Sequence, residues 1–302
     1  MQVTLASCTG LPEGDGDEAG LVEALRVHGL PARWQPWGDE VSADTLVVLR
    51  ATWDYPDRPE EFHRWCASVP HLANDHEVVR YNLDKSYLVA LAAAGVPVIP
   101  TRLVPPGEQL TPALAALDEL SGDPGTADGE IVIKPAVGAG SRGAGRFTAA
   151  QADEALAHLR SLHAAGSVAL VQPYQTTVDE HGETALVFFA GRYSHAFTKG
   201  PMLQGGAVDT DDLYLQEKLS AATPDEATRA VAGQALAATA RELGIQVSDL
   251  LYARVDVVRG ANGPLVLEVE LTEPSLGFAF GGAPALERFA QAIADRAKAA
   301  LS

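Results

Sequence analysis

Two short segments near the C-terminal end carry charged side chains in a pattern that suits metal binding. Arg254 and Asp256 alternate with apolar residues in one segment, and Glu268 and Glu270 do so in the other. The Gly-Ala-Asn-Gly sequence between them is typical of a tight turn, so the pattern predicts a β-hairpin. A three-residue loop that ends at a left-handed Gly263 places Asp256 opposite Glu268. The same register places Arg254 opposite Glu270, and all four side chains share one face because side chains alternate along a strand.

The other face of this hairpin is apolar and is expected to belong to the core; it carries Val255, Val257, Leu267 and Val269. On the charged face, three carboxylates of a half-buried sheet resist ionising together, and a divalent cation would compensate them. An all-oxygen ligand set favours Mg²⁺ or Mn²⁺ over zinc. The hairpin therefore predicts a metal site made by Asp256, Glu268 and Glu270. A solvated polar face with one Arg–Glu pair is the alternative interpretation.

A glycine-rich segment, residues 137–145, has four glycines in nine residues. Glycines allow backbone N–H groups to approach an anion closely. No Gly-Lys-Ser/Thr sequence follows, so the segment is not a P-loop. A flexible hairpin tip is the alternative, but Lys134 ends an apolar strand directly before the loop. Packing explains a lysine poorly at that position, whereas contact with a phosphate explains it well.

Two further lysines could add positive charge to the same site. Lys199 ends a predicted strand, and Lys85 lies in the first turn of a predicted helix, where it opposes the helix dipole. For Lys85, an exposed surface lysine is the alternative. Lysines at strand ends, a glycine loop and clustered acids together are what a protein needs to bind ATP with a divalent cation.

The elements that must position these residues form three predicted modules, 1–82, 83–170 and 171–302. The first module alternates strands and helices and predicts a parallel sheet, with strands at 3–8 and 45–49 and helices at 18–28 and 60–68. Arg50 and Tyr55 follow the carboxyl end of a strand, where open α/β sheets bind ligands. The acidic segment 14–18 is expected to be a flexible loop that caps the next helix.

The second and third modules combine helices with antiparallel strands. In the second module, Asn82 or Asp84 can cap the helix that carries Lys85, and residues 121–130 read as a polar loop. Its other predicted elements are strands at 96–100 and 131–134 and a helix at 151–165. The third module is predicted to contain strands at 170–174, 184–190 and 192–199, a helix at 225–243, the acidic hairpin and a helix at 284–300.

The composition of the chain limits which classes of binding partner are expected. The formal net charge of −18, with a pI near 4.7, argues against nucleic acids and anionic membrane surfaces as partners. Two cysteines do not indicate a disulfide framework. We expect a cytoplasmic protein, because the first residues lack a basic signal-peptide region and no uncharged apolar run reaches membrane-spanning length.

From about residue 82 to residue 275, the chain resembles the ATP-grasp superfamily, because its motifs occur in that family's order. The motifs are Asn82-Leu-Asp-Lys85, Gly95-Val-Pro-Val-Ile-Pro-Thr101, Ile131-Val-Ile-Lys134-Pro with the glycines after it, Val171-Gln-Pro-Tyr174, Lys199, Arg254-Val-Asp256 and Glu268-Val-Glu270. The resemblance implies an α/β fold, α+β in the C-terminal half, in which a Rossmann-like domain precedes the ATP-grasp domain. One departure is that the family usually has Glu-x-Asn where this chain has Glu268-x-Glu270, which leaves the metal role of Glu270 open.

The resemblance also implies roles for individual residues. The residues implied in nucleotide binding are Lys85, Lys134, Gly138, Gly140, Ser141, the hinge residues Gln172 and Tyr174, and Asp179 or Glu180 as the ribose acid. Lys199 is implied to face the phosphates, and Arg254 to stabilise the tetrahedral oxyanion. Closure of the glycine loop is implied to exclude water.

The implied activity is that of a ligase. ATP phosphorylates a carboxylate, ADP leaves, and a nitrogen nucleophile displaces phosphate. Arg50, Tyr55 and Ser275 are expected at the acceptor site, although a structural salt bridge is the alternative for Arg50. The segments around these residues resemble the glutathione-synthetase-like branch, which includes the cyclo-ligase of cycloserine biosynthesis, an antibiotic pathway. That likeness implies O-ureido-D-serine as substrate; an intermolecular amino-acid or peptide ligase and a non-catalytic nucleotide-binding module are the alternatives. The family is often dimeric, so a homodimer is expected.

Overall fold

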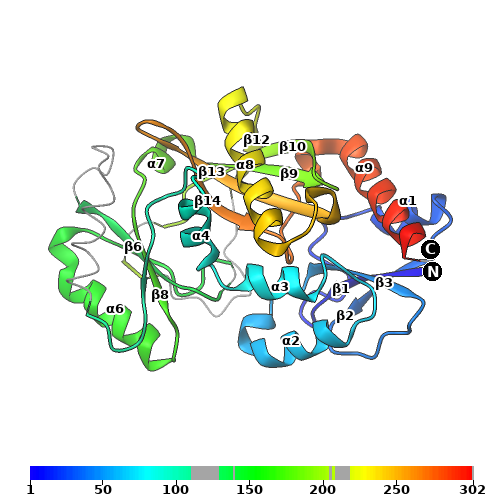
Figure 1. Ribbon diagram of the computed structural model, residues 1–302, viewed down its shortest axis with the longest axis horizontal. Coiled ribbons are helices and arrows are strands. Elements are labelled where there is room, and N and C mark those ends of the chain that lie inside the picture. Colours follow the sequence, from blue (N-terminus) through cyan, green and yellow to red (C-terminus); the bar gives the residue numbers. More distant parts are fainter. Residues whose placement is uncertain (110–128, 139, 204–205, 208–217, 301–302) are drawn as a thin grey trace.

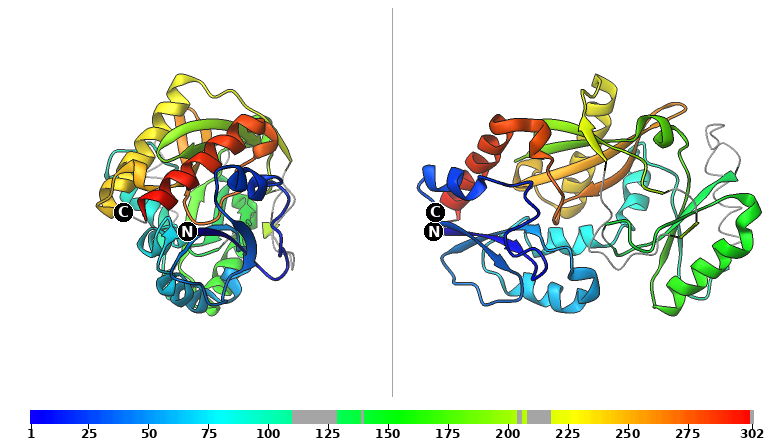
Figure 2. Two further views of the ribbon diagram at one scale, coloured as in Figure 1. Left: turned by 90° about the vertical axis from the view of Figure 1, so that its right-hand side faces the viewer. Right: turned by 180° about the vertical axis from the view of Figure 1, so that it is seen from behind.

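The molecule is elongated and is built on three β-sheets (Figure 1). The computed structural model describes residues 1–109, 129–138, 140–203, 206–207 and 218–300. Figure 2 shows the sheet that carries helix α6 (Ala152–Ala164) at one end of the molecule and the N-terminal sheet at the other end. We call the sheet next to α6 the middle sheet because most of its strands lie between those of the other two sheets in the sequence. The predicted loop 121–130 lies mostly outside the described residues.

The N-terminal sheet is parallel, as predicted, with the strand order β2-β1-β3-β4. Its strands are β1 (Gln2–Ser7), β2 (Ala32–Pro36), β3 (Thr45–Ala51) and β4 (Leu72–Ala73). Every residue of β3 is buried, as expected for a central parallel strand with both faces covered. The accompanying helices are α1 (Leu21–Val27), the short 3₁₀ helix η1 (Tyr55–Asp57), α2 (Pro59–Ser68) and α3 (His76–Leu83).

The middle sheet is antiparallel and carries the glycine loop. Its order is β11-β7-β6-β8-β5, with β5 (Arg102–Val104), β6 (Ile131–Pro135), β7 (Gly145–Phe147), β8 (Ala169–Pro173) and β11 (Gly206–Ala207). The 3₁₀ helix η3 (Ala149–Gln151) leads into α6, which packs on the sheet through Leu159 and Leu162. The glycine loop is the connection between β6 and β7, so it projects from the end of this sheet.

The C-terminal sheet is also antiparallel and carries the acidic hairpin. Its order is β12-β10-β9-β13-β14, with β9 (Glu183–Phe189), β10 (Arg192–Lys199), β12 (Leu219–Ala221), β13 (Tyr252–Gly260) and β14 (Gly263–Glu270). Helices α4 (Tyr87–Ala93) and α8 (Glu226–Leu243) cover one face, and α9 (Phe278–Ala299) packs between the other face and the N-terminal sheet. The remaining short helices are α7 (Thr177–His181) and η4 (Val247–Asp249).

The hairpin has the predicted cross-strand pairs, but its loop is shorter than predicted and one strand contains a bulge. Arg254 lies opposite Glu270 and Asp256 opposite Glu268, as predicted. The loop between the paired Gly260 and Gly263 is one residue shorter than expected, and a bulge on β14 restores the register. Gly263 has a φ of +132°, which favours glycine. The bulge moves Leu267 out of its expected core position, so that it is only partly buried and faces the ligand cavity.

Lys85 does not lie in a helix; it occupies the connection between α3 and α4. Asn82 does not cap a helix either, because its side-chain amide binds the Val269 carbonyl and the Leu271 N–H of the C-terminal sheet, each at 2.7 Å. Asp84 accepts a hydrogen bond from the Ser86 N–H at 2.9 Å. Asn82 therefore anchors the segment that carries Lys85 to the end of β14.

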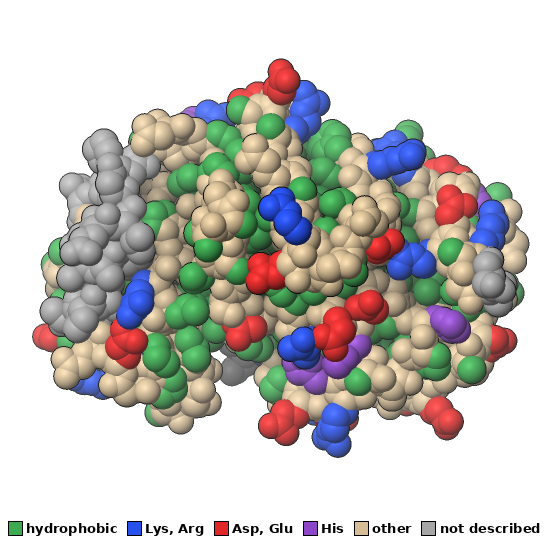
Figure 3. Space-filling model, in the orientation of Figure 1, with side chains coloured by type: hydrophobic (Ala, Val, Ile, Leu, Met, Phe, Trp, Pro, Cys, Tyr) green, Lys and Arg blue, Asp and Glu red, His purple; other side chains and the backbone are tan. Residues whose placement is uncertain are grey.

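Two further element predictions are corrected. Residues 96–100 form no strand; Val98 makes a single bridge to Val266. The last helix begins earlier than predicted, at Phe278, and is interrupted at Gly282, where φ is +64°. No helix in the described part of the chain is long and apolar enough to span a membrane. On the face drawn in Figure 3, the described basic side chains are scattered among acidic ones.

Candidate active site

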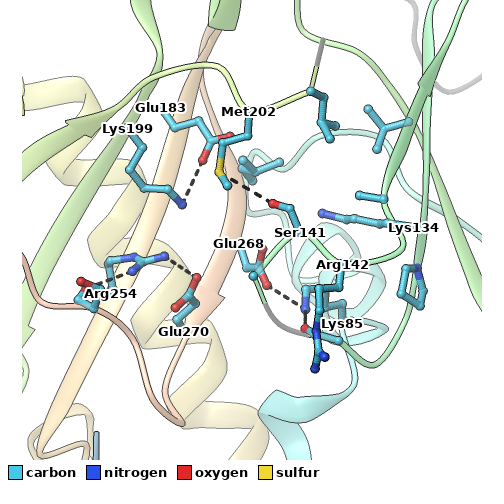
Figure 4. Close-up of a pocket in the computed structure, with 18 of the residues that line it drawn as sticks. Lys85, Lys134, Ser141, Arg142, Glu183, Lys199, Met202, Arg254, Glu268 and Glu270 are labelled. Carbon is cyan, nitrogen blue, oxygen red and sulfur yellow. Dashed lines mark hydrogen bonds and ion pairs between the residues drawn. The ribbon is translucent and has the colours of Figure 1, made fainter. Parts of the chain in front are cut away.

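A cavity of ≈ 350 Å³ lies where the three sheets meet, between the glycine loop and the acidic hairpin (Figure 4). Most of the residues singled out in the sequence line it: Tyr55, Lys85, Lys134, Gly138, Gly140, Ser141, Tyr174, Lys199, Arg254, Glu268, Glu270 and Ser275. Residues from segments more than 200 positions apart thus form one wall. The cavity combines an apolar end with a strongly charged end, which is typical of a small-molecule site.

The innermost charged group is Asp256, which is 1% exposed. Its carboxylate accepts hydrogen bonds from Arg254 at 2.9 and 3.0 Å and from Lys199 Nζ at 2.8 Å. Burial raises the pKa of Asp256, but Arg254 and Lys199 outweigh burial and hold that pKa at about 2. Asp256 is therefore an anion that fixes two cations beneath the cavity wall, and it does not itself line the cavity.

Glu268 and Glu270 face the cavity directly (Figure 4). Glu268 pairs with Lys85 Nζ at 3.0 Å, and Glu270 accepts a hydrogen bond from Arg254. Burial opposes ionisation of Glu268, but Lys85 and Lys134 lower its pKa below the ordinary value. Burial raises the pKa of Glu270 to about 7, and the neighbouring carboxylates of Asp256 and Glu268 add to the rise although Arg254 opposes it.

The expected three-acid metal site is not preassembled. Among the residues that the structure describes, no three Asp, Glu, His or Cys side chains are grouped closely enough to hold a metal ion. The two cavity-facing carboxylates, Glu268 and Glu270, nevertheless fit Mg²⁺, which is commonly held by one or two carboxylates together with substrate phosphates. Their present partners, Lys85 and Arg254, compensate the negative charge that a cation would otherwise neutralise.

The glycine loop presents its backbone to the cavity. Gly140, Ser141 and Gly143 have φ values of +61°, +59° and +70°, and positive φ is uncommon for a serine. His158, a residue of α6, contacts the Gly143 carbonyl through Nε2 at 2.9 Å. On the other side, Lys85 Nζ donates to the Gly138 carbonyl at 2.6 Å. The loop is thus held from both sides in a conformation that turns backbone groups toward the charged end of the cavity.

Lys134 lies beside this loop, and its ammonium group makes no ion pair or hydrogen bond with any other residue in the described ranges. Burial lowers the pKa of Lys134, and Lys85 and Lys199 lower it further although Glu268 opposes them. A partly buried ammonium group without a bonded partner destabilises the folded chain. The arrangement is explained by an anionic ligand that supplies the missing partner.

The opposite end of the cavity is apolar. The residues that form it come from four separate segments: Ile99, Val132, Tyr174, Val178 and Val258, with Leu203 and Leu267 packed against them. Such a slot suits a flat aromatic ring. Ile99, Val132 and Tyr174 belong to motifs noted in the sequence, but those motifs did not reveal that the three side chains form one wall, and the bulge that exposes Leu267 was not foreseen.

Three residues expected near the nucleotide do not line the cavity. Gln172 is buried, and its side chain donates to Thr101 Oγ1 at 2.9 Å. Asp179 accepts two hydrogen bonds from Arg146 at 3.0 Å and one from the Tyr174 hydroxyl at 2.5 Å. Glu180, the alternative to Asp179, has a side chain that is 81% exposed. The carboxylate that does line the cavity near the hinge is Glu183, which pairs with Lys199 at 3.2 Å.

Arg50 was expected at the acceptor site, but it is 1% exposed and does not line the cavity. The alternative, a structural salt bridge, describes its contacts. Its guanidinium binds Glu18 Oε1 at 2.7 and 2.8 Å and donates to the Pro274 carbonyl. Asp17, in the acidic segment 14–18, accepts three backbone hydrogen bonds from residues 276–278 at 2.7–3.0 Å. The segment therefore caps α9, not the next helix, and together with Arg50 it fixes the loop 273–278.

We predict that Arg50→Leu lowers the free energy of unfolding by about 3–5 kcal/mol, because it leaves the buried Glu18 carboxylate without its partner. Denaturant unfolding of purified protein measures the effect. The double variant Arg50→Leu/Glu18→Leu should recover part of the loss. Equal destabilisation by the single and double variants would show that packing, and not the buried charge, is responsible.

Two aromatic side chains of the N-terminal domain join that loop at the cavity wall. Trp53 Nε1 donates to the Glu273 carbonyl at 3.0 Å, and the buried Tyr55 lines the cavity together with Glu273, whose charge adds to burial in raising the pKa of Tyr55. Burial raises the pKa of Glu273 to about 8, and the neighbouring Glu270 carboxylate contributes to the rise. Ser275 lies beside them, and its carbonyl accepts a hydrogen bond from Arg254 at 2.9 Å. Segments 53–55 and 273–275 thus form one wall of the cavity, through Trp53, Tyr55, Glu273 and Ser275, and the acceptor role of this wall stays a prediction.

The comparisons with known proteins agree with this architecture. Residues 3–74 match the family described as D-cycloserine synthetase DcsG, N-terminal domain. The cycloserine biosynthesis protein DcsG of Streptomyces lavendulae is 44% identical over 293 residues, which are 94% of this chain and 95% of that protein.

Solved structures extend the likeness to the whole fold. A crystal structure of D-cycloserine synthetase DcsG has a TM-score of 0.84 at 41% identity and covers 98% of this chain and 100% of that one. A D-alanine–D-alanine ligase from Bacillus anthracis shares the fold, with a TM-score of 0.61 at 14% identity over 99% of this chain and 98% of its own. The chain therefore belongs to the D-cycloserine synthetase family of ATP-grasp ligases.

Proposed function

We propose that the protein is an Mg²⁺- and ATP-dependent cyclo-ligase that converts O-ureido-D-serine to D-cycloserine. The observation that carries the proposal is the single cavity in which a wall rich in cations and glycines meets the Trp53–Tyr55–Glu273 wall. The relatives indicate the substrate class, because they are a cycloserine biosynthesis protein and a D-cycloserine synthetase.

In the first step the substrate carboxylate attacks the γ-phosphorus of ATP, an acyl phosphate forms and ADP leaves. The apolar slot at Tyr174 would hold the adenine, and Lys85, Lys134 and the glycine-loop amides would hold the phosphates. Glu268 and Glu270 would hold Mg²⁺, with Asp256 behind them. When bound, Mg²⁺ neutralises the phosphate charge that develops during transfer.

In the second step the ureido nitrogen that is bonded to oxygen attacks the acyl carbon and closes a five-membered ring. The new C–N bond replaces the C–O bond to phosphate, which leaves with the bonding electrons, and the nitrogen loses its proton. Transfer of the carbamoyl group from that nitrogen to water then gives D-cycloserine and carbamate. Arg254, held by Asp256 and the Ser275 carbonyl, stabilises the oxyanion on the acyl carbon.

The test is to measure ADP and phosphate release with MgATP across small amino-acid carboxylates, O-ureido-D-serine among them, and to record product masses. A product with the mass of the isoxazolidinone supports the proposal. Turnover only with a separate amine would assign an intermolecular ligase instead. ATP binding without turnover of any acceptor would favour a regulatory nucleotide-binding module.

The proposal includes two properties of the whole protein. A small-molecule ligase whose two cysteines are both buried and unpaired suits a reducing, ATP-containing cytoplasm. A homodimer is the expected assembly. Light scattering on the purified enzyme measures its mass against the 31.7 kDa of one chain.

A further inference from the structure

Arg142 is a cavity-lining residue of the glycine loop to which the sequence motifs assign no role. Its guanidinium reaches across the cavity mouth, and Nη1 pairs with Asp57 Oδ1 of η1 at 3.2 Å. Asp57 belongs to the short helix that begins at Tyr55, a residue of the acceptor wall. Arg142 thus extends from the phosphate-binding loop toward the acceptor side of the cavity.

The other two nitrogens of this guanidinium lack partners. Nε and Nη2 are buried, yet neither has a hydrogen-bond acceptor in the part of the protein that the structure describes. A buried donor without an acceptor destabilises a folded protein. Nε and Nη2 lie on the same edge of the guanidinium, and that edge matches the two oxygens of a carboxylate or a phosphate. This unpartnered edge therefore has the shape and charge to bind a bidentate oxyanion.

The substrate of the proposed reaction brings a carboxylate, and apart from Arg254, which faces the oxyanion that forms on the acyl carbon, the cavity has no assigned partner for it. Arg50, the residue expected to bind it, is committed to Glu18 and lies outside the cavity. Lys85 and Lys134 flank the phosphate-binding loop, whereas Arg142 is tied to the acceptor side through Asp57. We propose that Arg142 binds the carboxylate of the amino-acid substrate through Nε and Nη2, and that Asp57 is a positioning residue for it.

This inference rests on the proposed function and deepens it. Removal of a charge-assisted hydrogen-bond pair predicts that Arg142→Gln raises the KM for the amino-acid substrate about 10- to 100-fold, with the affinity for MgATP unchanged. Arg142→Lys should recover part of the loss, because lysine keeps the charge but not the fork. Asp57 has a side chain that is 61% exposed, so Asp57→Asn should raise the same KM only about 2- to 5-fold.

The experiment is steady-state kinetics with each substrate varied in turn, together with competition by the carboxamide analogue of the substrate. The wild-type enzyme should bind the carboxylate more tightly than the carboxamide, and Arg142→Gln should lose that preference. Arg80→Gln, which removes an exposed arginine from a comparable ion pair with Glu77, is the matched control and should leave both KM values unchanged.

A rise in the KM for MgATP alone would assign Arg142 to the phosphates and overturn the proposal, as would unchanged kinetics in Arg142→Gln. Failure of the proposed function looks different, because the wild-type enzyme itself would then not cyclise O-ureido-D-serine. The Arg142 comparison is in that case made with the carboxylate that the substrate screen identifies, and the same outcomes decide it.

Discussion

Glu268→Gln is expected to lower MgATP-dependent turnover at least about 100-fold while the fold stays intact. Its carboxylate faces the cavity, and Lys85 and Lys134 lower its pKa, so glutamine removes a full negative charge at almost constant volume. The loss of the proposed metal ligand and of the charge that pairs with Lys85 should remove several kcal/mol of transition-state stabilisation, and each 1.36 kcal/mol is tenfold in rate. ADP release measured against Mg²⁺ concentration should also show a weaker dependence on the metal.

The matched control is Glu23→Gln, which removes an exposed carboxylate from a surface ion pair on α1. Turnover, circular dichroism and melting temperature should all remain at wild-type values in that variant. If Glu268→Gln retains turnover within about threefold, Glu268 is not a metal ligand, and its role is limited to holding Lys85.

The hairpin shows how far a local pattern can predict a site. The alternation of charged and apolar residues predicted which side chains share a face, since a one-residue slip would turn Arg254 and Asp256 toward the apolar core that α4 and α8 cover. The turn length was wrong because a β-bulge compensates a one-residue change without altering the outer pairs. Burial of the apolar face determines which residues pair, and the loop length and the bulge on β14 accommodate that pairing.

Arg50 and Lys85 show where local reasoning fails. The partner of Arg50 is Glu18, which belongs to a loop that seemed only acidic, and their contact depends on how α9 packs against the N-terminal sheet. Lys85 was assigned to a helix because Asn82 resembled a helix cap in the local sequence. The true partner of Asn82 is β14, and this contact spans 187 residues, so the local sequence could not reveal it. The domain boundaries 1–82, 83–170 and 171–302 stay predictions.

The charged end of the cavity is balanced internally. Asp256, Glu183, Glu268 and Glu270 face Lys199, Arg254 and Lys85, so that most carboxylates have a cation within bonding distance. A nucleotide with its metal ion could enter by exchange of partners, the phosphates taking the lysines and the metal ion taking the acids. Such an exchange avoids exposing any isolated charge in the low-dielectric cavity, where the penalty is large.

Lys134 is the exception to this balance, because its ammonium group has no bonded partner among the described residues. A substitution at Lys134 should therefore change the affinity for MgATP and the stability of the fold in different directions. We expect Lys134→Met to weaken MgATP binding about 10- to 100-fold, because a charge-assisted contact with phosphate is lost. The same variant should melt at the wild-type temperature or above it, since methionine removes a partly buried ammonium group without a bonded partner and fills a similar volume.

Calorimetric titration with a non-hydrolysable ATP analogue and thermal unfolding without ligand measure the two effects. Lys298→Met, at a site where the side chain is 73% exposed, is the control and should alter neither quantity. A variant that binds the analogue normally but melts at a lower temperature would assign Lys134 to the structure of the loop. Opposite shifts in affinity and stability would instead identify it as a residue whose buried charge is tolerated for the sake of the ligand.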